Sequence, residues 1–280
     1  MNDAPVRLDA LLPSEIAERA STVGVKKAGM SVINIFMLAV LAGGFVSLGA
    51  LFATVSTAGA GGILPYGLAR VIYGLVFCLG LILVIVAGAE LFTGNMLITM
   101  AWASGKVTTR ALLRNWIIVY AGNLVGALVT AGLVFFSGQY RFGDGVIGQA
   151  MLNIAAHKVE YGFVQAVALG ILCNALVCIA IWLTLGAHTT TDKILAILFP
   201  ISAFAAIGFE HSIANMYFIP MGLFINQFDP AFAAASGIDL AHLTLSGFLN
   251  NLIPVTIGNI IGGVVMVGGV YWFVYLREHR

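Results

Sequence analysis

The chain has 280 residues, of which 60% are hydrophobic and only 9% charged, and its mean hydropathy is +1.02. Soluble domains carry about 25% charged residues, so the composition excludes a soluble globular protein and indicates an integral membrane protein. Long apolar runs between short polar breaks are typical of transmembrane helices rather than of the alternating strands of a barrel.

Residues 1–27 form the first predicted element. Four basic and four acidic residues balance within it, and it lacks the apolar core of a cleavable signal sequence. "PSEIAERA" predicts a short helix capped by Ser14, with Ile16, Ala17 and Ala20 on a weakly apolar side. We expect a cytoplasmic segment, and a plain solvated leader is the alternative.

Six apolar runs follow, at about 30–56, 64–102, 111–137, 161–187, 194–226 and 247–276. A membrane-spanning helix needs about 20 residues, so each run predicts one span. The second and fifth runs exceed one span, yet neither has room for two spans and a turn. Residues 28–276 are therefore the expected membrane domain, and 277–280 are expected to be a short cytoplasmic tail.

Basic residues predict the orientation of these spans. With the N-terminus inside, the outer loops hold Arg70, Arg141 and Lys158. The inner face holds the other ten: Arg7, Arg19, Lys26, Lys27, Lys106, Arg110, Arg114, Lys193, Arg277 and Arg280. By the positive-inside rule, both termini are expected in the cytoplasm and the 227–246 loop outside.

Both overlong runs contain the same polar motif. "AELFTGNM" places Glu90 five residues before Asn95, and "FEHSIANM" places Glu210 five residues before Asn215. Backbone at membrane depth can leave the helix only where protein or a water-lined cavity satisfies its polar groups. We therefore expect helix interruptions at about 89–95 and 208–214. The two carboxylates brace the breaks, with free backbone N–H groups as natural partners, or alternatively act in transport.

A second motif repeats in the same order. "GNLVGALV" at 122–129 recurs as "GNIIGGVV" at 258–265. Spans 1–3 thus correspond to spans 4–6, and because each half has three spans, the second half is expected to be inverted. Gly122, Gly126, Gly258 and Gly262 are expected to let neighbouring helices approach closely.

The remaining polar and sulfur-containing residues have simpler interpretations. Cys78, Cys173 and Cys178 lie in apolar runs and are expected to be packing residues. Lys158 stands at the outer mouth, where it either concentrates an anion or snorkels to the interface. His157, His188, His242 and His279 lie at or beyond span ends. His211 is different, because it is ionisable and falls within the second expected break.

The motifs "AGAELFTGNM", "GNLVGA", "GFEHSIANMY" and "NLIPVTIGNIIGG" resemble those of the formate/nitrite transporter family, and the likeness is greatest to its bacterial formate channels. The likeness runs from "LLPSEIAERA" to "YWFVYLRE". It implies an aquaporin-like fold of six spans and a homopentamer with one pore in each protomer.

The resemblance also implies roles for particular residues. Thr93 and His211 would form the pore centre, and Asn174 and Lys158 would lie along the outer approach to the histidine. The outer constriction would be Phe77 and Phe204, and the inner constriction would be Leu81, Leu91, Phe92 and Val177. Without the resemblance, Phe77, Leu81 and Val177 would be interpreted as core residues.

We therefore expect an all-α channel or proton-coupled facilitator for formate in a bacterial inner membrane. Nitrite or hydrosulfide is the alternative substrate. A membrane-embedded enzyme that uses Glu210 and His211 is a remote alternative function. A structural or sensory membrane protein would need no breaks at midplane. No cofactor, metal or nucleic acid is expected, and the N-terminal segment is a candidate gate or docking site for a formate-producing enzyme.

Overall fold

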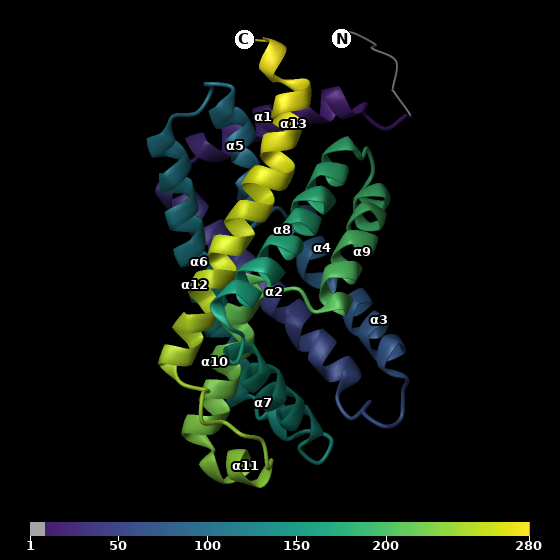
Figure 1. The fold of residues 1–280 in the computed structure, drawn as a ribbon, viewed down its shortest axis with the longest axis vertical. Coiled ribbons are helices and arrows are strands. Elements are labelled where there is room, and N and C mark those ends of the chain that lie inside the picture. The colour runs from purple at the N-terminus through teal and green to yellow at the C-terminus, as the bar shows by residue number, and fades with distance from the viewer. Residues whose placement is uncertain (1–8, 280) are drawn as a thin grey trace.

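The fold is entirely helical in the computed structural model, which describes residues 9–279 (Figure 1). Six helices in this part of the chain are long and apolar enough to cross a membrane: Val32–Thr57, Tyr66–Ala87, Thr109–Phe136, Phe163–Gly186, Thr190–Ile207 and Leu245–Tyr275. In element labels these are α2, α3 with α4, α6, α8, α9, and α12 with η3 and α13. The expected six spans are confirmed.

The other elements connect these spans. The N-terminal helix α1 covers Pro13–Gly29, and the second span divides into α3 (Tyr66–Phe77) and α4 (Leu79–Ala87). Between the spans lie η2 (Gln139–Arg141), α7 (Val146–Val159), α10 (Ser212–Phe228) and α11 (Pro230–Ala235), and η4 (Arg277–His279) follows the last span. The last span comprises α12 (Leu245–Ile261), the π-helix η3 (Gly262–Gly269) and α13 (Val270–Tyr275). Helices α1 and α13 lie at one end of the molecule, and α7 and α11 lie at the other (Figure 1).

Helix α1 is longer than the sequence predicts and begins differently. Its N-cap is Leu12, whose backbone N–H donates to Glu15 Oε2 at 2.8 Å, so Ser14 is not the cap. The Leu12 side chain cannot accept a hydrogen bond from the first turn, so Glu15 supplies the side-chain contact at this N-cap, and it does so through the Leu12 N–H. Ile16, Ala17 and Ala20 are buried as expected. Since α1 runs to Gly29, the expected boundary between residues 27 and 28 falls inside this helix.

Both interruptions are present. Helix α4 ends at Ala87, and the chain becomes helical again only in η1 (Gly94–Leu97) and α5 (Ile98–Ala103). Helix α9 ends at Ile207 and α10 begins at Ser212, so the last three residues of the expected 208–214 window are helical. Gly88 (φ 84°) and Gly208 (φ 92°) adopt left-handed conformations, and the next N–H reaches back to Val84 or Phe204 in a Schellman motif.

The repeated glycines bring helices into close contact. A Cβ on Gly122 or Gly126 would overlap the backbone or side chains of α2, and one on Gly258 or Gly262 would overlap the backbone of α8. Helix α6 therefore packs on α2 as α12 packs on α8, and the two halves share one arrangement. The expected fold class is confirmed: six transmembrane helices in two inverted three-helix repeats, with the second and fifth interrupted.

Outside the spans, an ion pair joins the loops around η2 and α11. Arg141 donates to Asp229 Oδ2 at 2.7 Å, and the Tyr140 hydroxyl donates to the same oxygen at 2.7 Å. The Arg141 guanidinium holds the pKa of the Asp229 carboxyl below its usual range. This ion pair lies outside the cavities described below.

Candidate transport site

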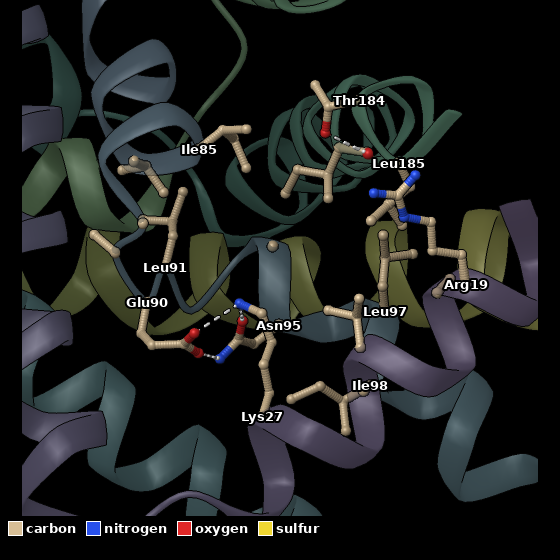
Figure 2. A pocket seen from close by; sticks show the side chains of 18 of the residues that line it. Arg19, Lys27, Ile85, Glu90, Leu91, Asn95, Leu97, Ile98, Thr184 and Leu185 are labelled. Atoms are coloured by element: carbon tan, nitrogen blue, oxygen red, sulfur yellow. Dashed lines mark hydrogen bonds and ion pairs between the residues drawn. The ribbon is translucent and has the colours of Figure 1, made fainter. Parts of the chain in front are cut away.

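A polar cluster stands beside the first break, and we call Lys27, Glu90, Asn95 and Asn115 the inner cluster. Lys27 Nζ lies 2.9 Å from Glu90 Oε1 and donates to Asn95 Oδ1 at 2.8 Å (Figure 2). Asn95 Nδ2 donates to Glu90 Oε2 at 2.7 Å and to Asn115 Oδ1 at 2.9 Å. Asn115 donates in turn to the Lys27 carbonyl at 3.3 Å. The cluster thus ties α1 to the break and to α6.

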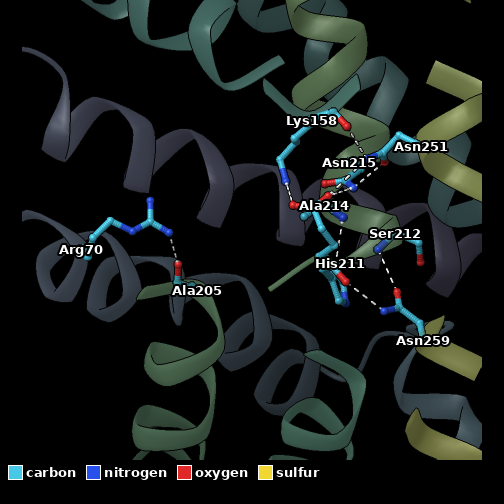
Figure 3. A network of polar contacts seen from close by, with 10 residues as sticks. Arg70, Lys158, Ala205, His211, Ser212, Ala214, Asn215, Asn251 and Asn259 are labelled. Carbon is cyan, nitrogen blue, oxygen red and sulfur yellow. Dashed lines mark hydrogen bonds and ion pairs between the residues drawn. The ribbon is translucent and has the colours of Figure 1, made fainter. Parts of the chain in front are cut away.

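The second break carries the same arrangement, and we call Lys158, Glu210, Asn215 and Asn251 the outer cluster. Lys158 Nζ donates to Glu210 Oε1 at 2.7 Å, and Asn215 Nδ2 donates to Glu210 Oε2 at 2.6 Å (Figure 3). Asn215 also donates to Asn251 Oδ1, and Asn251 donates to the Lys158 carbonyl, both at 2.7 Å. The Lys158 side chain is only 13% exposed, against 28% for Lys27. Lys158 therefore points to a buried carboxylate and does not snorkel to the interface.

One asparagine bridges each break to the neighbouring helix. Asn123 donates to the carbonyls of Ala39 and Glu90 and accepts from the Phe92 N–H. Asn259 likewise donates to the carbonyls of Gly170 and Glu210 and accepts from the Ser212 N–H. Backbone groups that leave the helix thereby find partners inside the protein, as the membrane requires.

This arrangement corrects the expected partners of the two glutamates. Backbone N–H groups of the breaks bond to Asn123 and Asn259, while Glu90 and Glu210 are held by lysine and asparagine side chains. A lysine neutralises a buried carboxylate, which an N–H dipole alone does not do. Each glutamate also accepts a hydrogen bond from the asparagine five residues later in the repeated motif.

Thr93 and His211 meet between the two breaks. Thr93 Oγ1 lies 2.9 Å from His211 Nε2, and both residues are buried. His211 is the N-cap of α10, where its Nδ1 accepts the Ala214 N–H at 3.1 Å. An accepting Nδ1 carries no proton, so in the neutral ring the proton is on Nε2, which donates to Thr93. The pair therefore presents one N–H and one hydroxyl at the centre of the molecule.

Three cavities lie in series around this pair. The inner cavity, of about 290 Å³, is lined by Arg19, Lys27, Glu90, Leu91 and Lys193 among others (Figure 2). The outer cavity, of about 130 Å³, is lined by residues that include Arg70, Phe77, Lys158, Phe204, Glu210 and His211. Between them a central cavity of about 10 Å³ is lined by Val46, Phe77, Leu81, Leu91, Val177, Ile201, Phe204 and His211.

Shared residues show where these cavities adjoin. Leu91 lines both the inner and the central cavity, whereas Phe77, Phe204 and His211 line both the central and the outer one. The rings of Phe77 and Phe204 stand edge to face, with centroids 5.5 Å apart. The central cavity has room for about one water molecule. The path in this conformation is therefore narrowed by apolar side chains on both sides of His211.

Three of the expected positions differ from this path. Thr93 is fully buried and lines none of the three cavities, so it meets the path only through its contact with His211. The Phe92 ring packs against Trp116 and Tyr120 of α6, and Phe92 does not line the central cavity. Asn174 is fully buried away from the outer cavity, and its Nδ2 donates to the carbonyls of Thr93 and Asn259. Asn174 thus holds the Thr93 backbone in place. Side-chain direction within a break depends on local backbone geometry, which residue spacing does not specify.

Sequence reasoning missed the asparagines of α6 and α12 and the pairing of Lys27. Asn115 and Asn123 are eight residues apart, as are Asn251 and Asn259, and this repeated spacing was a usable signal. In "GNLVGALV" and "GNIIGGVV" the glycines predict helix packing, whereas the adjacent asparagines Asn123 and Asn259 hold the breaks. Nothing in the sequence links Lys27 to Glu90, because the contact joins α1 to a distant break.

The inner and outer cavities carry an electrostatic bias toward anions. Arg19, Lys27 and Lys193 line the inner cavity with Glu90, and Arg70 and Lys158 line the outer cavity with Glu210. Cations therefore outnumber carboxylates in each, and such clefts raise the local concentration of anions. Inverted halves, broken helices and a buried polar pair between two cavities define a membrane channel or transporter.

Comparison with known proteins identifies the family. The profile of the family described as formate/nitrite transporter matches residues 14–273. "Formate channel FocA" of Escherichia coli (strain K12) is 46% identical over 276 residues, covering 97% of this chain and 96% of that protein. "Formate channel FocA" of Haemophilus influenzae is 42% identical and covers 92% of this chain and 93% of that protein. The chain belongs to the formate/nitrite transporter family.

Solved structures agree with this assignment. A structure described as "Pentameric formate channel with formate bound" matches with a TM-score of 0.82 and 43% identity, covering 88% of this chain and 98% of that chain. One described as "FNT family ion channel" matches with a TM-score of 0.80 and 28% identity, covering 93% of this chain and 99% of that chain. These relatives are channels or transporters, as expected for a protein that is not an enzyme.

Proposed function

We propose that this protein conducts formate through a pore in each protomer of a homopentamer. The Thr93–His211 pair, buried between two cation-lined cavities, is the observation that carries the proposal. Relatives named formate channels and a pentameric structural neighbour with formate bound support both the substrate and the assembly.

The path from each cavity to His211 explains how a small acid would cross. The excess of cations over carboxylates in the inner and outer cavities favours an anion at the two entrances, and Phe77, Phe204 and Leu91 then remove its hydration. A naked anion is costly among apolar side chains, whereas the neutral acid is not. At the centre, the His211 N–H donates to the anion and the Thr93 hydroxyl donates to it or accepts from the acid.

Proton coupling would require His211 to become cationic. Protonating Nδ1 breaks its bond with the Ala214 N–H, so the ring would have to release the start of α10. An arriving anion favours that charged form. The site thus supports hydrogen-bond donation by a neutral ring at rest and proton loading only when the substrate is present.

Flux measurements test the substrate. Purified protein in liposomes should carry formate faster than nitrite or hydrosulfide, each measured as uptake above that of empty liposomes. Formate uptake equal to that of empty liposomes would refute the proposal. A higher rate for nitrite or hydrosulfide would assign the chain to the alternative substrate.

We place the protein in a bacterial inner membrane with the α1 end in the cytoplasm. The charge bias supports this orientation, although two of its residues, Arg7 and Arg280, lie outside the described part of the chain. Single cysteines at exposed positions 106 and 239, in a protein whose three native cysteines are replaced by alanine, test it. An impermeant maleimide added to intact cells should label position 239 only. Labelling of position 106 would invert the topology.

The N-terminal segment is proposed to regulate entry at the inner mouth. Ile16 contacts Gly186 at the end of α8, and Arg19 and Ala20 line the inner cavity. Deleting residues 1–20 removes Ile16, Arg19 and Ala20 from the inner mouth. We therefore expect an intact pentamer whose formate flux has a different pH dependence. Deleting residues 1–8 is the matched control and should preserve the wild-type profile. An unchanged profile after the longer deletion would reduce the segment to a leader.

The same segment could also dock a cytoplasmic formate-producing enzyme. Its exposed face presents Glu18 and Arg19 beside the inner mouth, where formate would be released directly to the cavity. Co-purification of such an enzyme with the full chain, and its loss after deletion of residues 1–20, is the expected result.

A further inference from the structure

Arg70 makes contacts that neither the polar clusters nor the Thr93–His211 pair uses. Its Nε donates to the Ala206 carbonyl at 2.8 Å, and one terminal nitrogen donates to the Ala205 carbonyl at 2.6 Å (Figure 3). Arg70 belongs to α3, whereas both carbonyls belong to the last turn of α9. The last carbonyls of a helix lack intrahelical partners and carry partial negative charge, so a guanidinium there both pairs and neutralises them.

This contact is continuous with the outer constriction. The Arg70 guanidinium lies 4.9 Å from the Tyr73 ring centroid, and the Tyr73 ring stacks on Phe77 at 6.3 Å. Phe77 meets Phe204 edge to face at 5.5 Å. Arg70, Tyr73 and Phe77 share one face of α3, because they are three and four residues apart. Phe204 directly precedes the two carbonyls that Arg70 holds.

The inner half has no equivalent of this contact. Ile85 and Val86 correspond to Ala205 and Ala206 at an offset of 120 residues. Within residues 9–279 their carbonyls accept no side-chain hydrogen bond, and Lys193 at the inner cavity makes none to them. The guanidinium contact is therefore present at the outer constriction, formed by Phe77 and Phe204, and absent from the corresponding place in the inner half.

We propose that Arg70 is a positioning residue that sets the width of the outer constriction by tying α3 to the end of α9. The inference rests on the proposed formate conduction. It assigns the selection of substrates by size to the contact of Arg70 with the Ala205 and Ala206 carbonyls. Gly74 already brings α3 against the Ser202 backbone, so Arg70 closes the same helix pair at its outer end. Without it, Phe77 and Phe204 would separate and admit larger carboxylates.

The test is the ratio of acetate to formate flux through the pentamer in liposomes. A tight apolar site discriminates one extra methylene by about tenfold or more, so we expect Arg70→Gln to raise the ratio by about threefold to tenfold. Arg70→Lys keeps the charge but loses the planar guanidinium that donates to two carbonyls at once, so it should give an intermediate ratio. Arg141→Gln, which removes an outer arginine far from the cavities, is the matched control and should keep the wild-type ratio.

Two results would overturn the inference. The first is an unchanged ratio of acetate to formate flux in an intact Arg70→Gln pentamer. This includes a parallel fall of both fluxes, which would assign Arg70 to anion attraction. If Arg70→Gln yields no pentamer, the Arg70→Lys ratio decides, and a wild-type value there contradicts the inference. Failure of formate conduction itself appears separately, as wild-type protein with no flux above empty liposomes.

Discussion

Liposomes that contain the His211→Asn protein should carry formate with almost no histidine-dependent response to pH. Asparagine is a good N-cap and can replace the bond to the Ala214 N–H, so the fold and the pentamer should persist. It cannot take up a proton. We expect the flux to change by less than about twofold between about pH 5 and about pH 7, where an ordinary histidine titrates.

The comparison variant is Thr93→Val. It removes the hydroxyl that faces His211 but leaves the backbone contact with Asn174. Formate flux should fall, because one partner of the anion is lost, while its pH dependence should remain. Wild-type flux with wild-type pH dependence in His211→Asn would show that the histidine is only a satisfied core residue, and the mechanism would be wrong.

The Asn259→Leu protein should be much less stable than the wild type. Leucine has a similar volume but leaves the Glu210 carbonyl and the Ser212 N–H without partners in a buried site, and it removes a second donor from the Gly170 carbonyl, which keeps its bond within α8. Each unsatisfied buried group costs about 1–3 kcal/mol, so the two groups together should cost about 2–6 kcal/mol. The measurement is the temperature at which half of the detergent-solubilised protein loses its pentamer peak on size exclusion.

Asn250→Leu is the matched control on the same helix. Asn250 is exposed, and its replacement should change stability by no more than about 0.5 kcal/mol. Equal unfolding temperatures for the two variants would mean that Asn259 does not hold the break. In that case the polar groups of the break would have to be satisfied by another route.

Residue order was sufficient to predict the large features of this fold. Six spans follow from apolar runs, because a lipid environment demands about 20 apolar residues for each crossing. The breaks follow from Glu90, Gly88 and their counterparts Glu210 and Gly208, since such residues are costly inside an uninterrupted span. The inverted repeat follows from two motifs that recur in the same order. The Thr93–His211 pairing came from family resemblance and not from spacing.

Only the tertiary structure decided which groups neutralise the two glutamates, where Phe92 and Asn174 point, and how Arg70 reaches α9. The Lys27–Glu90 pair joins residues 63 positions apart and the Arg70–Ala206 bond residues 136 apart. Such contacts depend on how helices cross, and no local periodicity reports that. At an offset of 120 residues His211 corresponds to Leu91, so the repeat departs from symmetry at the site itself. Sequence determines where polar groups enter the membrane, whereas packing decides which partners offset the free-energy cost of burying them there.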